Sequence, residues 1–394
     1  MRIIYNIGIR VYAFAIRLAS TINPKANLFL KGRNNILTDQ ENALSKSKNT
    51  VWVHCSSLGE FEQAKPIIID YRLINPTHKI LLTFFSPSGY EIRKNTQLAN
   101  WVFYLPLDSP SNAREFVRIV NPIKAIFVKY DFWFNYMSEL KDNKIPLYSV
   151  SSKFRIEQSF FKYKWFAKQL KNISHFFVQD IMSAQLLKKI GFTNVTISGD
   201  TRFDSVLINS KKTTEFPLIK IFTKDRDTII CGSTWPKDER LLINYIKNNP
   251  QYNYIIAPHE MRHISSLQKK TNAILYSNTN AKNIKNYKVL IIDNIGILSH
   301  IYRYCKIAYV GGGFGIGIHN LLEAVAFGLP VIFGPNYNKF NEAQEIIKLK
   351  AGISISNYVE LDSAIKKFRK FDNSIAYNYI QNNSGATKKI LSAL

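Results

Sequence analysis

Two carboxylates follow strand-like runs of the chain, at places where an α/β protein carries out chemistry. Glu60 comes after the run 51–57, at the start of a helical pattern, and Asp131 comes after the run 124–130. Such a carboxylate accepts a proton from an attacking hydroxyl when burial raises its pKa toward neutrality. In the alternative, Glu60 stabilises a helix dipole, and Asp131 is a helix N-cap, the commoner role at such a position. Position alone supports both roles of Glu60 equally, and as the catalytic alternative Asp131 would hold an acceptor or orient Glu60.

A glycine run interrupts another strand-like segment, 307–310, before a helical pattern begins. The run contains Gly311, Gly312 and Gly313. Glycines let backbone N–H groups approach a ligand, and a helix start favours negative charge, so we expect an anion such as a phosphate here. The spacing matches neither GxGxxG nor GxxxxGKS/T, which argues against a dinucleotide site and an ATPase and leaves a nucleotide sugar as the better ligand. The alternative is an ordinary flexible turn.

Histidines near these segments have open roles. His319 and Asn320 follow the glycines and either bind a ligand or cap a helix. His259 and His263 stand four residues apart, as metal ligands on a helix do, but neither an HExxH frame nor a carboxylate at a defined spacing accompanies them. We therefore expect no metal and no cofactor.

Length and composition indicate a globular, intracellular protein of two domains. The chain has 394 residues, of which 46% are hydrophobic. Cys55, Cys231 and Cys305 lie far apart without a CxxC pair, so we expect neither a disulfide framework nor a structural zinc site. The formal net charge of +25 points to an anionic partner, either nucleic acid or an anionic membrane. Because the lysines are dispersed and no nucleic-acid-binding signature occurs, we expect no nucleic acid.

The N-terminal segment 1–23 favours a membrane as the anionic partner. It is mostly apolar, but Arg10 and Arg17 make it a poor spanning helix, and no small-residue cleavage site marks a secretory signal. On a helix its polar residues fall within an arc of roughly 80°, and apolar residues fill the remainder. We predict a helix in the membrane interface, so that the protein is monotopic or peripheral. The alternative is an amphipathic helix docked on its own domain.

Short β-branched and aromatic runs alternate with helix-length segments along the rest of the chain, as parallel βαβ units require. They lie at 51–57, 79–85, 101–105, 124–130, 145–150, 175–179 and 195–198, and then at 228–232, 252–257, 288–292, 307–310 and 330–333. We predict an α/β fold of two Rossmann-like domains, 24–205 and 206–394, facing each other across a cleft, with 206–227 as the connection. The last helix is expected to pack back on the first domain. The arrangement resembles the GT-B architecture of glycosyltransferases, in which ligands sit outside the carboxyl ends of strands.

Several motifs together resemble the 3-deoxy-D-manno-octulosonic acid (Kdo) transferase family. They occur in the family's order and cover most of the chain. They are His54–Glu60, Ser86–Glu91, Tyr104–Asp108, Gly199–Asp204, Gly232–Thr234, Ala257–Arg262, Gly311–Glu323 and Gly334–Ala343. The resemblance implies an inverting glycosyltransferase of lipopolysaccharide biosynthesis that moves Kdo from CMP-Kdo to a lipid A precursor. It would act at the cytoplasmic face of the bacterial inner membrane, where a basic surface meets anionic lipid.

The resemblance also implies roles for particular residues. Glu60 matches the family's general base, which deprotonates the acceptor hydroxyl. We assign donor binding to Arg202, Ser233, Thr234, His259, Arg262, Gly311, Gly312, Gly313, His319, Asn320 and Glu323. We assign acceptor binding to Ser57, Gly59, Ser88 and Gly89. The family is understood to work without a metal.

The chain departs from the family's pattern in two places. Lys129-Tyr130-Asp131 stands where the family usually has Glu-x-Glu, so the first acid is replaced by a base and the second is shortened. Arg202 replaces a lysine that is common in its motif, which keeps the charge but changes the geometry. The alternatives are another GT-B enzyme that uses a UDP-sugar, as a transferase or an epimerase, and a catalytically inactive scaffold on the membrane.

Overall fold

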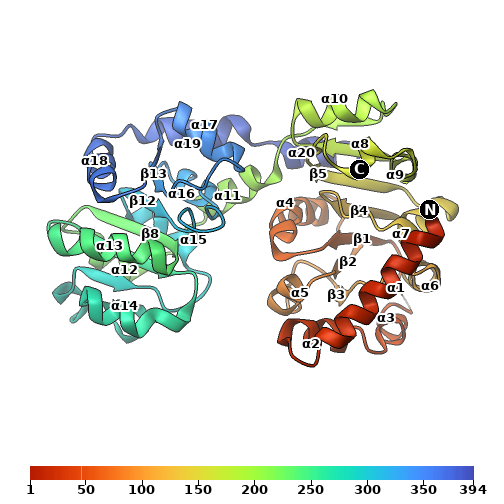
Figure 1. The fold of residues 1–394 in the computed structure, drawn as a ribbon, viewed down its shortest axis with the longest axis horizontal. Coiled ribbons are helices and arrows are strands. Elements are labelled where there is room, and N and C mark those ends of the chain that lie inside the picture. The colour runs from red at the N-terminus through yellow and green to blue at the C-terminus, as the bar shows by residue number, and fades with distance from the viewer. Residues whose placement is uncertain (46) are drawn as a thin grey trace. The chain divides into compact units, whose positions relative to one another are not determined.

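The chain forms two compact units, each built around its own sheet (Figure 1). The structure is a computed structural model that describes residues 1–45 and 47–394. The N-terminal unit comprises Met1–Ser205 together with Ser384–Leu394, and the C-terminal unit comprises Val206–Asn383.

The N-terminal unit contains a seven-stranded parallel sheet in the order β3-β2-β1-β4-β5-β6-β7. Its strands are β1 (Thr50–Cys55), β2 (Lys79–Phe84), β3 (Trp101–Tyr104), β4 (Lys124–Val128), β5 (Leu147–Ser152), β6 (His175–Val178) and β7 (Val195–Ile197). The connecting helices are α4 (Leu58–Ile74), α5 (Pro87–Arg93), α6 (Pro110–Val120), α7 (Phe134–Asp142), α8 (Ser159–Lys162), α9 (Lys164–Gln169), η1 (Leu170–Asn172) and α10 (Ile181–Lys189).

Both faces of this sheet are buried, which explains why its strands read as continuous apolar runs. Successive side chains of a strand point to opposite faces. Accordingly Trp52 belongs to one core cluster, while Val51 and Val53 belong to another. The β-strands predicted for this half are therefore present.

Three helices precede the sheet: α1 (Arg2–Ala19), α2 (Pro24–Lys31) and α3 (Ile36–Leu44). Helix α1, red in Figure 1, is held to the N-terminal unit by Tyr5, whose hydroxyl donates to Asp108 Oδ2 at 2.6 Å and whose ring lies 4.8 Å from that of Phe134. Asn6 Oδ1 accepts a hydrogen bond from Asn135 Nδ2 at 2.9 Å. The helix is thus docked through a partly polar face. Across residues 1–45 and 47–394, no helix is both long enough and apolar enough to cross a membrane.

The C-terminal segment returns to the N-terminal unit. Asp204 lies in α11 (Thr201–Lys211), and its Oδ2 accepts hydrogen bonds from the N–H and the hydroxyl of Thr387, both at 2.7 Å. The N–H of Gly385 donates to the other carboxylate oxygen at 2.5 Å. These bonds fix the start of α20 (Ala386–Leu391), which packs on α4.

The C-terminal unit contains a second seven-stranded parallel sheet, in the order β10-β11-β9-β8-β12-β13-β14. Its strands are β8 (Thr228–Thr234), β9 (Asn253–Pro258), β10 (Ile274–Leu275), β11 (Val289–Ile291), β12 (Ile307–Val310), β13 (Val331–Phe333) and β14 (Gly352–Ser354). Its helices are α12 (Pro217–Thr223), α13 (Pro236–Asn248), η2 (Met261–His263), α14 (Ile264–Thr271), η3 (Tyr276–Asn278), η4 (Ile284–Asn286), α15 (Leu298–Ile301), η5 (Tyr302–Tyr304), α16 (Leu322–Val325), α17 (Asn341–Lys348), α18 (Tyr358–Phe368) and α19 (Asn373–Asn383). The predicted α/β fold with two parallel sheets is confirmed, and the edge strands β10 and β14 are additions to the prediction.

Strand order identifies one special point in each sheet. In the N-terminal unit the order reverses between β1 and β4, and in the C-terminal unit it reverses between β8 and β12. Ligands of open α/β sheets bind outside the carboxyl ends of the strands at such switch points. Glu60 follows β1 and Asp131 follows β4, while the glycine run follows β12. The candidate residues therefore lie at the positions where the topology favours a site.

Candidate active site

Glu60 is held by the turn that joins β1 to α4. The backbone N–H and the hydroxyl of Ser57 both donate to Glu60 Oε2, at 2.7 and 3.0 Å. Glu60 occupies the third position of α4 and is partly buried. Its other oxygen, Oε1, accepts no hydrogen bond from the residues that the structure describes. The carboxylate is thus oriented through one oxygen, and the second is available to a substrate.

Asp131 faces Glu60 from the loop after β4. Its Oδ2 accepts a hydrogen bond from Ser56 N–H at 2.9 Å, and α7 begins only at Phe134, so the N-cap reading of Asp131 is wrong. Burial and the neighbouring Glu60 carboxylate raise the pKa of Asp131 to about 7, although Ser56 and Lys129 oppose the rise. A neighbouring like charge disfavours the ionised form of a carboxyl group. Asp131 is therefore partly protonated near neutral pH.

This raised pKa predicts how stability depends on pH. In the unfolded chain Asp131 loses its proton near pH 4, whereas in the folded protein it keeps the proton to about pH 7. The free energy of unfolding should therefore fall as the pH rises between these values and level off above them. Asp131→Asn should remove this decline, as measured by urea unfolding at pH 4.5 to 8.5. Glu60→Gln should shorten it, because the like charge is gone. Parallel profiles for the parent and Asp131→Asn would contradict the assignment.

A buried network supports the loop that carries Asp131. Trp133 Nε1 donates to His54 Nε2 at 3.0 Å, and His54 Nδ1 lies 2.9 Å from Thr83 Oγ1. Burial lowers the pKa of His54 to about 3, so the ring is neutral. Lys129 adopts a left-handed φ of 61°, and its carbonyl accepts a hydrogen bond from Ser149 Oγ at 3.0 Å. These contacts fix the loop after β4, and His54 acts here as a structural residue.

The residues predicted to bind the acceptor lie around the same turn. Ser86 N–H donates to the carbonyl of Ser56 at 2.8 Å, which brings the 86–89 loop against the β1–α4 turn. A Cβ atom on Gly89 would lie 3.1 Å from the carbonyl carbon of Ser57 and 2.3 Å from the Phe84 ring, so this approach requires glycine. Gly59 is exposed beside them. Ser57, Gly59, Ser88 and Gly89 therefore lie close together around this turn of the N-terminal unit, with Gly89 buried.

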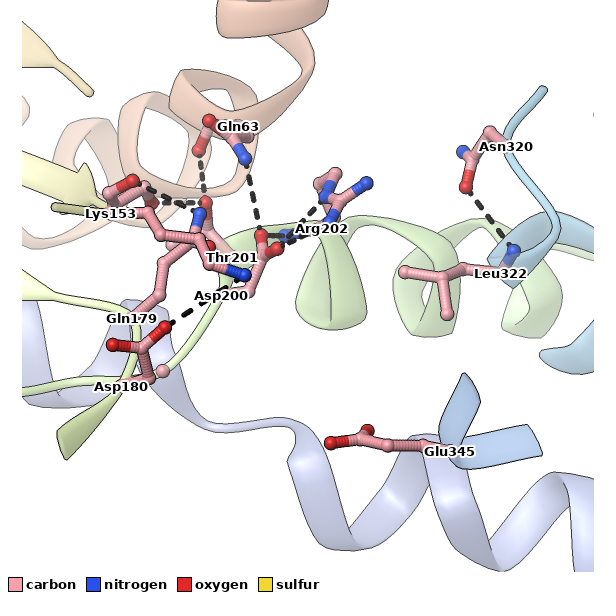
Figure 2. A network of polar contacts seen from close by, with 12 residues as sticks. Gln63, Lys153, Gln179, Asp180, Asp200, Thr201, Arg202, Asn320, Leu322 and Glu345 are labelled. Carbon is pink, nitrogen blue, oxygen red and sulfur yellow. Dashed lines mark hydrogen bonds and ion pairs between the residues drawn. The ribbon is translucent and has the colours of Figure 1, made fainter. Parts of the chain in front are cut away.

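Arg202 belongs to the N-terminal unit and not to the unit that carries the glycine run. Figure 2 shows its guanidinium paired with Asp200, with Nε and Nη2 at 2.9 and 2.8 Å from Asp200 Oδ2. Gln63 Nε2 donates to Asp200 Oδ1 at 3.3 Å, and Gln63 lies one turn beyond Glu60 on α4. Arg202 is thereby linked to the helix of the candidate base. Its role toward the donor stays a prediction.

The glycine run packs closely instead of leaving all of its amides open. Gly311 N–H donates to the carbonyl of Gly232 at 2.9 Å, and Gly312 N–H donates to Asp238 Oδ2 at 3.0 Å. Cβ atoms on Gly311 and Gly313 would lie 2.3 and 2.6 Å from backbone atoms of Ser233 and Gly334. The amides of Gly311 and Gly312 are therefore not available to a phosphate. The helix expected directly after the run is also different, because α16 has four residues and begins only at Leu322.

Other predicted donor residues do assemble at the carboxyl ends of β8, β9 and β12. His259 N–H donates to the carbonyl of Thr234 at 2.9 Å, and His319 N–H donates to that of Gly311 at 3.1 Å. The rings of His259 and His319 lie 4.4 Å apart. Ser233, which precedes Thr234, has a left-handed φ of 52°.

The remaining donor candidates lie at the margins of this group. Arg262 is mostly exposed and lies 3.8 Å from the carboxylate of Glu260. Asn320 accepts a hydrogen bond from Leu322 N–H at 3.2 Å, as Figure 2 shows, and its amide donates to Glu323 Oε1 at 3.1 Å. Asn320 thus bonds to the first two residues of α16, although the N-cap position itself is Leu321.

Asp238 is a buried residue of this region that sequence reasoning missed. Its Oδ1 accepts a hydrogen bond from the Tyr309 hydroxyl at 2.7 Å, and its Oδ2 accepts from the N–H groups of Gly312 and Trp235 at 3.0 and 2.9 Å. It thereby joins β12, the glycine run and the start of α13. The available signal was an acid in the first turn of a helix after a strand, the same pattern that indicated Glu60. In the part of the chain described, no three His, Cys, Asp or Glu side chains gather as a metal site.

Known proteins match the chain at two levels. Residues 31–205 match the family model described as 3-deoxy-D-manno-octulosonic-acid transferase (kdotransferase). A 3-deoxy-D-manno-octulosonic acid transferase of Aquifex aeolicus is 28% identical over 326 residues, which cover 81% of this chain and 86% of that protein. The enzyme of the same name from Rickettsia prowazekii is 26% identical and is covered to 79%, against 88% of this chain.

Solved structures show the same fold at low identity. A UDP-GlcNAc 2-epimerase from Neisseria meningitidis has a TM-score of 0.60 at 14% identity, covering 87% of this chain and 98% of its own. A glycosyltransferase from Rickettsia africae has a TM-score of 0.57 at 14% identity, covering 88% and 98%. The similarity to these structures establishes a GT-B-like fold, whereas the sequence matches establish similarity to Kdo transferases. The chain is therefore a glycosyltransferase that resembles the Kdo transferase family over most of its length.

Proposed function

We propose that this protein transfers Kdo from CMP-Kdo to a lipid A precursor in lipopolysaccharide biosynthesis, with inversion at the anomeric carbon and Glu60 as the general base. One observation carries the proposal. Glu60 is an oriented carboxylate beside the raised-pKa Asp131, at the switch point of the unit that matches the family model. The relatives named above carry the name of the same activity.

The proposed transfer needs one base and one leaving group. The acceptor hydroxyl oxygen forms a bond to the anomeric carbon of Kdo, and the bond from that carbon to the CMP phosphate oxygen breaks. CMP leaves with the electron pair, and the hydroxyl proton passes to Glu60. With its pKa raised to about 7, Asp131 is partly protonated near neutral pH, and this reduces its repulsion of a charge on Glu60. The positive charge of Lys129 offsets part of the repulsion between the two carboxyl groups.

In this proposal the C-terminal unit holds the departing CMP. Ser233, Thr234, His259 and His319 lie at its switch point and contribute hydrogen-bond donors, while Arg262 contributes charge. Glu323 is assigned to the ribose hydroxyls. Because two glycine amides bond within the protein, we assign the phosphate to side chains and to other amides of the loop. No metal or cofactor is invoked.

The acceptor is a lipid, so we propose that the enzyme works at the surface of the inner membrane, attached through α1. Ile3, Ile7, Val11, Phe14 and Leu18 of this helix are 52–75% exposed. Tyr5 anchors a different face of the helix to the N-terminal unit. An exposed apolar stripe flanked by arginines is typical of helices that lie in a membrane interface. The large positive charge of the chain adds attraction to anionic lipid.

The test is a transfer assay with purified protein, CMP-Kdo and a tetraacylated lipid A precursor in detergent. We expect CMP release and an acceptor mass that rises by Kdo units. No release together with no binding of CMP-Kdo would overturn the donor assignment. A UDP-GlcNAc arm, followed for transfer and epimerisation, tests the alternative of a UDP-sugar enzyme. Turnover in that arm alone would replace the proposed function.

A further inference from the structure

A tryptophan and a histidine form a directional pair at the switch point of the C-terminal unit. Trp235, between β8 and α13, donates its Nε1–H to Nε2 of His319 at 2.8 Å. An indole N–H only donates, so Nε2 of His319 must present a lone pair. A neutral imidazole with a lone pair on Nε2 carries its proton on Nδ1. The contact thus selects one tautomer of His319.

The surroundings of His319 keep this tautomer neutral. Burial, and then the neighbouring His259, lower the pKa of His319, whereas Asp238 opposes the shift. The His259 ring stacks on that of Trp235 at 4.6 Å, which limits movement of the indole. Asp238 accepts the backbone N–H of Trp235 at 2.9 Å and so fixes the start of the same segment. Protonation of His319 on Nε2 would set two N–H groups against each other.

The Nδ1–H group of His319 has no acceptor among the residues that the structure describes. His319 Nδ1 makes no hydrogen bond to any described residue, and it is not among the buried polar atoms that lack a partner. This donor is therefore accessible at the carboxyl ends of β8, β9 and β12. An accessible donor at a switch point, on a ring whose position is fixed, is suited to an oxygen of a ligand.

We propose that Trp235 is a positioning residue that holds His319 as a neutral Nδ1–H donor to an anionic oxygen of the nucleotide-sugar donor. The identity of the ligand rests on the proposed function, whereas the tautomer of His319 follows from the structure alone. The oxygen belongs either to the phosphate or to the Kdo carboxylate. Both are anionic oxygen acceptors, and binding experiments distinguish them.

The tautomer is tested by nitrogen-15 NMR of the full chain with labelled histidines. His319 should show a protonated Nδ1 and an unprotonated Nε2 at pH 7 to 8, above the ordinary pKa of histidine. Trp235→Phe keeps an aromatic ring but removes the N–H, so His319 should become a mixture of tautomers with a higher pKa. Trp133→Phe is the matched control, because it removes the same kind of bond to His54 in the other unit and should leave the His319 signals unchanged. A protonated Nε2 in the parent would overturn the proposal.

The ligand is tested by calorimetry with cytidine, CMP and CMP-Kdo. Trp235→Phe should weaken binding by about fivefold or more, the worth of one net hydrogen bond. A loss with CMP but not with cytidine identifies the phosphate, and a loss with CMP-Kdo alone identifies the carboxylate. Equal affinity of parent and variant for all three would overturn the donor role. If the parent binds none of them, the proposed function and the ligand assignment fail together, and the spectra still decide the tautomer.

Two substitutions of His319 show which ring nitrogen faces the ligand and distinguish this from a general loss of structure. An Asn amide nitrogen stands where Nδ1 stands, and a Gln amide nitrogen reaches the place of Nε2. His319→Asn should therefore bind CMP-Kdo within about threefold of the parent, whereas His319→Gln should lose about tenfold. The reverse order would show that Nε2 faces the ligand and would overturn the proposal.

Discussion

Glu60→Gln is expected to lower the rate of Kdo transfer by about a thousandfold while leaving the protein folded. A positioned general base contributes roughly 10²- to 10⁴-fold, and an amide cannot take the hydroxyl proton. The fold should persist because the amide oxygen can still accept the hydrogen bonds that Ser57 donates to Oε2. The rate is measured from CMP release with saturating CMP-Kdo and lipid acceptor, and donor affinity should stay within about twofold.

Glu62→Gln is the matched control for this substitution. Glu62 lies two residues further along α4 and pairs with Arg93 at 2.8 Å on the partly exposed side of the helix. A surface ion pair of this kind contributes about 1 kcal/mol or less. The control should therefore retain transfer within about threefold. If Glu60→Gln keeps a tenth or more of the parent activity, Glu60 is not the base, and Asp131 becomes the residue to test in its place.

The strands could be predicted from sequence because both sheets are parallel and covered on both faces. Such strands are uninterrupted apolar runs, as Val51–Val53 and Ile307–Val310 illustrate. The edge strands β10 and β14 could not be found in the same way, since β10 has only two residues and β14 reads Gly-Ile-Ser, with two of its three residues only partly buried. Neither segment is a continuous apolar run. Their pairing depends on the neighbouring strand and is not encoded locally.

The candidate site was predictable only as far as strand ends determine it. The rule that ligands meet the carboxyl ends of strands located Glu60, Asp131 and the glycine run. The internal hydrogen bonds of the site were not readable, because they join residues far apart in sequence. Gly312 gives its amide to Asp238, 74 positions away, and Trp235 reaches His319 across 84 positions. The bonding of the glycine amides and the tautomer of His319 could therefore be inferred only from the three-dimensional structure.

Placing glutamates at Ile7 and Phe14 together is expected to release the protein from anionic vesicles. The two side chains are 52% and 63% exposed, so the substitutions should disturb the fold little. Burial of a large apolar side chain contributes about 1.5–3 kcal/mol, and two losses should lower vesicle binding by roughly a hundredfold or more. Binding is measured by sedimentation with phosphatidylglycerol–phosphatidylcholine vesicles. Transfer to an acceptor dispersed in detergent should be retained, because α1 contributes no residue to the proposed chemistry.

Leu73→Glu with Ile295→Glu is the control, because it adds the same charges at side chains that are 76% and 90% exposed elsewhere. If general repulsion between glutamates and anionic lipid were the cause, the control would lose binding equally. If instead the α1 variant sediments like the parent, the interface helix is not the attachment, and the dispersed lysines become its source. Raised salt separates these cases, since screening weakens attraction to head groups far more than burial of apolar side chains. Retention of the parent at high salt, with loss in the α1 variant, would therefore identify the apolar face as the anchor.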